Sequence, residues 1–182
     1  MHNAFAFVGG DSGAWRILSV TPERGEALAT ASHLDVVPAA AAPAGRAKSW
    51  SLIGQISNLR YATRDEVTTL RSRQEGLGRP EARRAALIPI RKSPDWWALA
   101  QDERRAIFED QSHHTAVGLD YLPHVARQLY HCRDLGQPFD FLTWFEYAPE
   151  HADRFEELVA RLRLTQEWRF VEREVDIRLE RP

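Results

Sequence analysis

The stretch at residues 125–147, VARQLYHCRDLGQPFDFLTWFEY, decides the fold. It holds two β-like runs, 125–132 and 139–147, and the second is rich in aromatic residues. The letters DLGQP at residues 134–138 separate the two runs, and a turn-rich connection of this length is typical of a β-hairpin. The stretch therefore predicts two neighbouring antiparallel strands.

Further elements flank this hairpin on both sides. We expect an apolar strand over residues 86–91 and a helix over 101–122, which ends before Pro123. After the hairpin, apolar residues at helical spacing predict a helix over 151–164, and alternating residues predict a closing strand over 168–179. The order β, α, β, β, α, β is that of a ferredoxin-like module.

The first half repeats this pattern in a weaker form. A helix with Thr63 as its N-cap is expected to reach Gln74, and the Ala- and Pro-rich residues 38–48 predict a surface loop. The β-like runs of this half lie at residues 4–8, 15–20, 33–37 and 50–61. We therefore predict the α+β class, with ferredoxin-like halves at residues 1–80 and 81–182, although no residue-level repeat links them. Two such sheets packed together would form an α+β barrel with room for a ligand.

The bulk composition excludes several classes of protein. The chain of 182 residues is 43% hydrophobic and 27% charged, and its formal net charge is −2. It carries no basic surplus of the kind that binds nucleic acid or anionic lipid. It has no apolar run long enough to span a bilayer, and residues 1–13 do not resemble a signal peptide. We therefore expect a cytoplasmic protein with no nucleic-acid or membrane partner.

Cysteine and histidine limit the metal chemistry. Cys132 is the single cysteine, which excludes an internal disulfide framework, a cysteine zinc cage and covalent haem attachment. Seven histidines are present, but their spacing does not form a zinc motif. A lone axial ligand fits the pattern better. On the expected helix, His114 shares a face with Val117 and Tyr121, whereas His113 is turned toward Glu109 and water. The alternative for His114 is a hydrogen-bonded core histidine without a metal.

Arg127 is the second candidate. Strand alternation places it on the same face as Val125 and Leu129. An arginine among apolar neighbours is costly unless it meets an anion or a carboxylate, so Arg127 indicates anion binding. A cation at the edge of a sheet is an equally good interpretation of the spacing alone.

Other candidates are individually weaker. Lys92 could bind an acidic group beside the aromatic pair Trp96 and Trp97, or be an exposed lysine at a strand end. Glu167 could accept a hydrogen bond from a buried imidazole, or be a solvated loop carboxylate. Asn58 and Tyr61 could donate to a ligand's carboxylates, or be ordinary residues at the end of a strand.

Ordered motifs run across nearly the whole chain. They are GGDSGAW at 9–15, SNLRY at 57–61, IPIRK at 88–92, WW at 96–97, DERR at 102–105, SHH at 112–114 and FDFLTWFE at 139–146. Each motif is weak alone, but the ordered set is highly specific. Together the motifs resemble the chlorite dismutase family, in particular its short branch without a signal peptide.

The resemblance implies a dimeric α+β barrel, a homodimer, and haem b bound in the second half. It implies an enzyme that converts chlorite into chloride and dioxygen. The roles implied by position are His114 as the iron ligand, Glu167 as its hydrogen-bond partner, Arg127 as the distal cation held by Gln74, Lys92, Asn58 and Tyr61 at the haem propionates, and Trp96 and Trp97 beside the macrocycle.

Three alternatives remain open. Coproheme decarboxylases are related, but they carry a catalytic tyrosine where this chain has Ile88, and Arg127 also departs from their pattern. Isoleucine can neither donate a proton nor form a radical. A haem-binding protein without turnover and a barrel that takes no haem are the other two alternatives.

Overall fold

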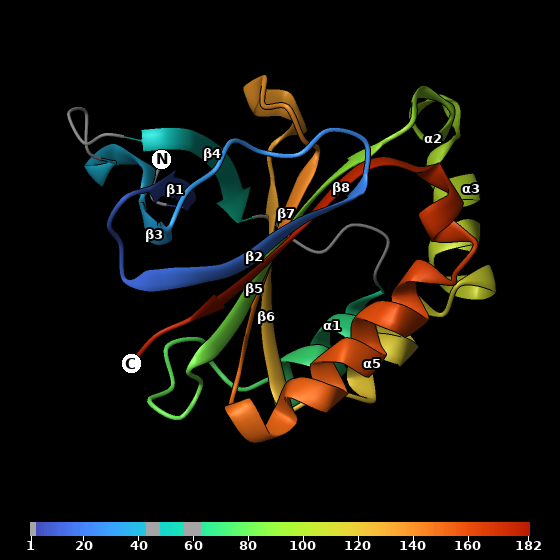
Figure 1. Ribbon diagram of the computed structural model, residues 1–182. Helices are drawn as coiled ribbons and strands as arrows, with labels where there is room; N and C mark the ends of the chain where they lie inside the picture. Colours follow the sequence, from blue (N-terminus) through green and yellow to red (C-terminus); the bar gives the residue numbers. More distant parts are fainter. Residues whose placement is uncertain (1–2, 43–47, 57–62) are drawn as a thin grey trace.

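Eight antiparallel strands close into a barrel in the computed structural model, which describes residues 3–42, 48–56 and 63–182 (Figure 1). The strand order is β1-β3-β2-β8-β5-β7-β6-β4. The strands are β1 (Ala4–Gly10), β2 (Trp15–Arg24), β3 (His33–Pro38), β4 (Lys48–Ile56), β5 (Arg84–Lys92), β6 (Val125–His131), β7 (Phe141–Tyr147) and β8 (Val171–Glu180). The helices are α1 (Arg64–Arg73), α2 (Pro94–Ala98), α3 (Gln101–Arg105), α4 (His114–Leu119) and α5 (Ala152–Arg163).

Each half of the chain contributes four adjacent strands. Their orders are β4-β1-β3-β2 and β8-β5-β7-β6, so the fourth, first, third and second strands follow one another in both halves. The two sets join along β2 and β8 and along β4 and β6. Among the residues described, the second seam is short and consists of the pairs Gln55–His131 and Ile56–Tyr130. The predicted α+β class is confirmed.

The interior of the barrel is filled with side chains. Trp15 packs edge-on against Trp144 with ring centroids 5.4 Å apart, and Phe7 packs edge-on against Tyr130 at 5.0 Å. All four side chains are almost completely buried. The prediction that the barrel would have room for a ligand is therefore wrong, because large aromatic side chains from both halves meet at its centre.

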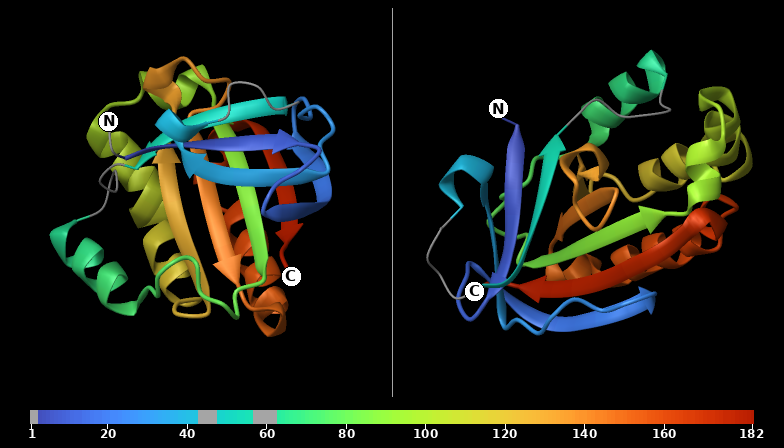
Figure 2. Two further views of the ribbon diagram at one scale, coloured as in Figure 1. Left: turned by 90° about the vertical axis from the view of Figure 1, so that its left-hand side faces the viewer. Right: turned by 90° about the horizontal axis from the view of Figure 1, so that it is seen from above.

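The outer face of the second-half strands is covered by helices. Figure 2 shows these helices gathered on the side of the barrel away from β1 and β3. Helix α5 buries an apolar stripe there, in which the ring of Phe155 stacks on Tyr147 at 4.5 Å and contacts Phe145 at 5.1 Å. The stripe also contains Leu158, Val159 and Leu162. The helical spacing of these residues in the sequence predicted this helix.

The helix expected over residues 101–122 is broken, which corrects the prediction. After α3 the chain forms a π-helix over Ala106–Gln111, and His113 then adopts a left-handed conformation with φ of 49°. Helix α4 starts afresh at His114, where the Glu109 carboxylate accepts a hydrogen bond from the Thr115 amide at 2.9 Å. Buried Ser112 fixes the break, because its hydroxyl accepts a hydrogen bond from the Glu167 amide at 2.9 Å.

Other boundaries also differ from expectation. The closing strand begins at Val171, because Glu167–Phe170 form a 3-10 turn, and the short helix α2 was not predicted. The capping box of Thr63 and Glu66 is present as its sequence indicated. The predicted strand over 50–61 and loop over 38–48 lie partly outside the described residues, and Ala39–Ala41 of that loop form a 3-10 turn. None of the helices described is long and apolar enough to cross a membrane.

Gly54 tests the short seam between β4 and β6. A Cβ atom at this position would lie 2.6 Å from the Cβ of Tyr130, an atom that cannot rotate away. We expect Gly54→Ala to lower the free energy of unfolding by about 1 to 3 kcal/mol, because the two strands would have to separate. Urea denaturation measures this change. Gly76→Ala is the matched control, since nothing lies within 4 Å of its Cβ position, and equal losses in both variants would contradict the explanation.

Candidate functional site

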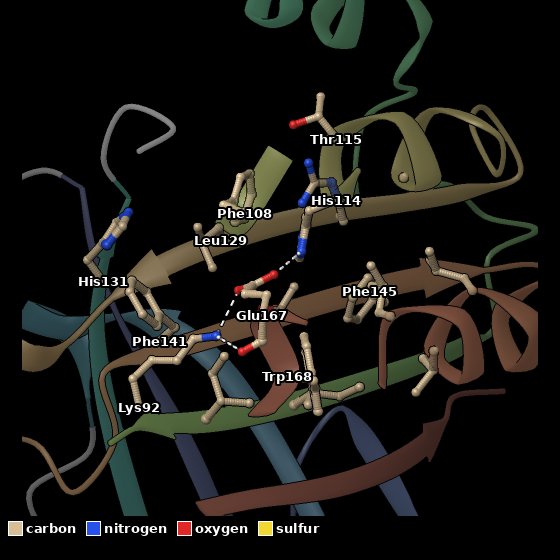
Figure 3. Close-up of a pocket in the computed structure, with 18 of the residues that line it drawn as sticks. Lys92, Phe108, His114, Thr115, Leu129, His131, Phe141, Phe145, Glu167 and Trp168 are labelled. Carbon is tan, nitrogen blue, oxygen red and sulfur yellow. Dashed lines mark hydrogen bonds and ion pairs between the residues drawn. The ribbon is translucent and has the colours of Figure 1, made fainter. Parts of the chain in front are cut away.

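A pocket lies between the outer face of β5, β6 and β7 and the helices α4 and α5 (Figure 3). Strand register arranges its floor in rows, one with Ile88, Thr143 and Leu129 side by side and the next with Ile90, Phe141 and His131. Arg127 and Phe145 pair in the row before these. The walls are Leu70, Trp96, Phe108, His114, Thr115, Gly118, Leu158, Val159, Leu162, Glu167 and Trp168.

His114 enters the pocket from the first residue of α4. Its Nδ1 lies 2.7 Å from Oε2 of Glu167, and the ring of Phe108 stacks on the imidazole at 4.4 Å. An ionised carboxylate can only accept, so Nδ1 carries the proton of this hydrogen bond, and in the neutral form of the imidazole the lone pair is on Nε2. No hydrogen bond joins that Nε2 to any of the residues described. His113 is exposed, as the sequence predicted.

Glu167 is held on three sides although it is almost completely buried. Its Oε1 accepts a hydrogen bond from Nζ of Lys92 at 2.8 Å, its Oε2 contacts His114, and its backbone amide donates to Ser112. Burial alone raises the pKa of Glu167, but the charge of Lys92, the attraction of His114 and the hydrogen bonds from both outweigh it and lower the pKa to about 2. Glu167 is therefore a carboxylate at neutral pH. The alternative of a solvated loop carboxylate is wrong.

Further hydrogen bonds hold the 3-10 turn Glu167–Phe170 in place. The indole nitrogen of Trp168 donates to the carboxylate of buried Glu174 at 2.8 Å. Arg24 of β2 donates to the backbone carbonyls of Trp168 and Val171, both at 2.9 Å. These bonds tie the turn to two strands, so the position of the carboxylate is set by the barrel.

Lys92 is buried in the pocket wall, where it binds an acidic side chain beside Trp96. Its side chain is only 2% exposed, so the alternative of an exposed lysine at a strand end is wrong. The ammonium contacts Glu167 and lies 4.7 Å from the ring centroid of Trp96. The backbone amide of Lys92 donates to Asp140 at 2.7 Å, which anchors the end of β5. A propionate contact would therefore share the ammonium with Glu167.

The two adjacent tryptophans separate. Trp96 is buried and lines the pocket. Trp97 is absent from the lining, since its ring stacks on Phe141 at 6.0 Å and its indole nitrogen donates to Asp140 at 3.2 Å. The guanidinium of Arg133 covers the Trp97 ring at 4.0 Å. Only one of the pair can therefore contact a ligand in the pocket directly.

Arg127 projects from β6 into the pocket. Of the residues described, none forms a hydrogen bond or an ion pair with its guanidinium, and burial lowers the pKa of Arg127. Arginine starts from so high a pKa that it stays cationic at neutral pH. The side-chain amide of Gln74 donates to the backbone carbonyl of Arg127 at 2.6 Å, so Gln74 holds the strand.

Sequence reasoning missed several residues of the site. Phe108, Ser112 and Asp140 became visible only through their contacts across the fold. His131 could have been found, because the alternation that selected Arg127 and Leu129 also selects it. Asn58 and Tyr61 lie outside the described residues.

Comparisons with known proteins place this fold in a family. The family model for chlorite dismutase matches residues 41–180. A chlorite dismutase of Ideonella dechloratans is 34% identical over 98 residues, which are 53% of this chain and only 33% of that protein. The match thus spans about a third of the length of that curated relative.

Solved structures extend the likeness to the whole chain. A dimeric chlorite dismutase from Nitrobacter winogradskyi is 63% identical, with a TM-score of 0.91 over 98% of this chain and 99% of that chain. A chlorite dismutase from Candidatus Nitrospira defluvii in complex with imidazole is 22% identical, with a TM-score of 0.69 over 98% and 91% of the two chains, a likeness of fold. With the family match over residues 41–180, these findings show that the chain belongs to the chlorite dismutase family.

Proposed function

We propose that this chain is a haem b-dependent chlorite O2-lyase that converts chlorite into chloride and dioxygen. The observation that carries the proposal is Arg127, a partly buried cation in an apolar pocket, with no anionic partner among the residues described. Such a cation is costly unless an anion binds beside it. Chlorite is an anion of suitable charge, and the N. winogradskyi relative is a chlorite dismutase.

The pocket fits a haem. Its lining is mostly aliphatic and aromatic, which suits a flat apolar macrocycle. His114 offers an Nε2 lone pair, and its Nδ1 is bound to a carboxylate, an arrangement that orients a ligating imidazole and raises its basicity. His114 would hold the iron, and Trp96 would contact the macrocycle. Lys92, Asn58 and Tyr61 as propionate ligands and Trp97 as a neighbour of the macrocycle stay predictions.

Several residues of the pocket would each have a separate role in the reaction. Haem iron, when bound, would supply the Lewis-acid and redox chemistry by which both Cl–O bonds of chlorite are broken and the O–O bond of dioxygen is formed. Arg127 would attract chlorite, orient it and retain the chlorine-containing fragment until the products form. Gln74 would act through the backbone of Arg127. The apolar lining would exclude water, and Glu167 would keep the Nδ1 proton in place.

Coproheme decarboxylase is the weaker candidate. Ile88 lies on the pocket floor beside Thr143, at the position where the resemblance places the catalytic tyrosine of those enzymes. Its side chain supplies no proton. A haem-binding protein without turnover would not need a cation such as Arg127, which has no anionic partner in the described part of the chain.

The assembly and organisation follow the same proposal. The N. winogradskyi relative is described as dimeric, and we propose a homodimer for this chain. We also propose that residues 1–80 and 81–182 are two ferredoxin-like halves, an interpretation supported by their identical strand order. The first half lacks a helix between β1 and β2, so it would be a degenerate copy. The cytoplasmic location stays a prediction.

His114 tests the haem site. We expect His114→Ala to abolish or greatly weaken haem retention after gel filtration, because the iron loses its protein ligand. His113→Ala should retain haem like the wild type, since that side chain is exposed. Soret absorbance per protein measures both. Equal haem loading in the two variants would reject His114 as the ligand.

Arg127 tests the reaction. We expect Arg127→Ala to bind haem but to release oxygen from chlorite about 100-fold more slowly, because one charge-assisted contact is worth roughly 2 to 4 kcal/mol. An oxygen electrode measures the rate. Without Arg127, more of the chlorine-containing fragment should escape as hypochlorite and bleach the haem. Methionine scavenges hypochlorite, so it should protect the haem of the variant more than that of the wild type. Wild-type oxygen yield and bleaching in Arg127→Ala would remove this residue from the mechanism.

Glu167 tests the electrostatics behind His114. We expect Glu167→Gln to raise the reduction potential of the bound iron, because the imidazole loses its anionic partner. Spectroelectrochemistry measures the potential. Glu146→Gln is the matched control, since Glu146 is a buried carboxylate that binds Trp144 and the Gly78 amide instead. A potential that stays constant or falls in Glu167→Gln would count against the proposed role.

A further inference from the structure

A second hollow lies at one end of the barrel, which we call the barrel-end hollow. It is found where β2, β3 and β5 begin and where β8 ends, close to the C-terminus marked in Figure 1. Its volume is about 500 Å³, and it shares no lining residue with the pocket that contains His114. The lining consists of Gly13, Ala14, Arg16, His33, Arg83, Arg84, Pro149, Glu180, Arg181 and Pro182.

Positive side chains dominate the lining of this hollow. Four of the ten described residues that form it are arginines, and Glu180 is the acidic residue among them. Strand pairing places Arg16 of β2 and Arg84 of β5 on either side of Glu180 of β8. Both guanidiniums bind its carboxylate, that of Arg84 at 2.8 Å. A single carboxylate therefore serves two cations.

The other two arginines have no carboxylate partner in the described part of the chain. The guanidinium of Arg181 lies 4.6 Å from the ring centroid of buried Trp15 and donates to the backbone carbonyl of Arg79 at 2.7 Å. The side chain of Arg83 is exposed. Neither contact of Arg181 brings a negative charge, so the hollow keeps an excess of positive charge.

The character of the hollow indicates the chemistry of a ligand. Positive charges gathered at one place repel one another, and a bound anion relieves this repulsion. Guanidinium is a planar, permanently charged donor that matches the oxygen atoms of phosphate and carboxylate groups. The volume lies in the range of small-molecule sites, and His33 carries the one aromatic ring of the described lining. These features favour a compact anion that carries several charges.

We propose that the barrel-end hollow binds a small multivalent oxyanion, such as a diphosphate or a tricarboxylate. Arg83 and Arg181 supply the charge that attracts the anion, and Arg16 and Arg84 donate to it from either side of Glu180. The carboxylate of Glu180 opposes binding, because it has the same sign of charge as the ligand. This inference does not depend on the proposed function, because the two pockets are separate.

Calorimetric titration of the purified protein with pyrophosphate and, separately, with citrate tests the inference. We expect at least one of these anions to bind with a dissociation constant below about 1 mM at low ionic strength. Arg83→Gln should weaken that binding about tenfold, because a charge-assisted contact is lost. Glu180→Gln should tighten it several-fold, because the competing carboxylate is gone. The anion that binds more tightly shows whether the ligand carries phosphate or carboxylate groups.

Two further variants separate a specific site from general attraction. Arg154→Gln removes one positive charge from an exposed position of α5 outside the hollow, and Arg127→Ala removes the cation of the other pocket. Both should bind the anion like the wild type. Thermal unfolding of each variant checks that the fold is retained.

Four outcomes would overturn the inference. They are the absence of binding by both anions, equal weakening in Arg83→Gln and Arg154→Gln, loss of binding in Arg127→Ala, and weaker binding in a folded Glu180→Gln variant. The last outcome is informative because a carboxylate that only held the arginines in place would weaken binding when removed, whereas a competing carboxylate strengthens it.

Discussion

Glu167 is an ionised carboxylate that is almost entirely removed from water, and the second half of the fold is arranged around it. A lone charge in this place would cost several kcal/mol, so its partners have to be supplied by the fold. Lys92 reaches the carboxylate from the end of β5 and His114 reaches it from the start of α4. Removing one partner of a buried charge typically costs about 3 to 5 kcal/mol. Ser112, in the break before α4, accepts a hydrogen bond from the backbone amide of Glu167. The left-handed His113 lies between Ser112 and His114, which bind the backbone and the side chain of the same glutamate.

The barrel supplies the rigid frame for this arrangement. Alternation along β5, β6 and β7 sends one set of side chains to the aromatic interior and the other set to the pocket. The interior is so full that the ligand site has to lie on the outer face, under α4 and α5. Because strand pairing fixes the rows of the floor, residues that are distant in sequence lie in one row. Ile88 and Leu129, for example, lie on opposite sides of Thr143.

The sequence predicted the parts of this site that depend on local periodicity. The strands, the Thr63 cap and the inward faces of α5 and β6 follow from alternation or helical spacing, and alternation placed Arg127 on the face that lines the pocket. His114 also lines the pocket, but the sequence placed it there through one continuous helix that does not exist. The break after Gln111 and the burial of Lys92 involve contacts with Glu167, which is 55 residues from Ser112 and 75 residues from Lys92, so no local pattern could reveal them. The filled barrel likewise depends on tryptophans from both halves meeting.

The pocket is lined by two cations, buried Lys92 and partly buried Arg127, and they differ in whether the described chain provides a carboxylate partner. This difference makes the two sides of the pocket electrostatically unlike. Lys92 is neutralised by a carboxylate that the chain itself provides. Arg127 has no carboxylate partner among the residues described, although burial also makes its charge costly. A fold that pairs one cation and leaves the other without a partner in the described part of the chain gives up stability at the second position. Since Lys92 and Glu167 lie behind His114 while Arg127 lies on the floor, an external anion, if it binds as proposed, would complete the electrostatics on the side of β6.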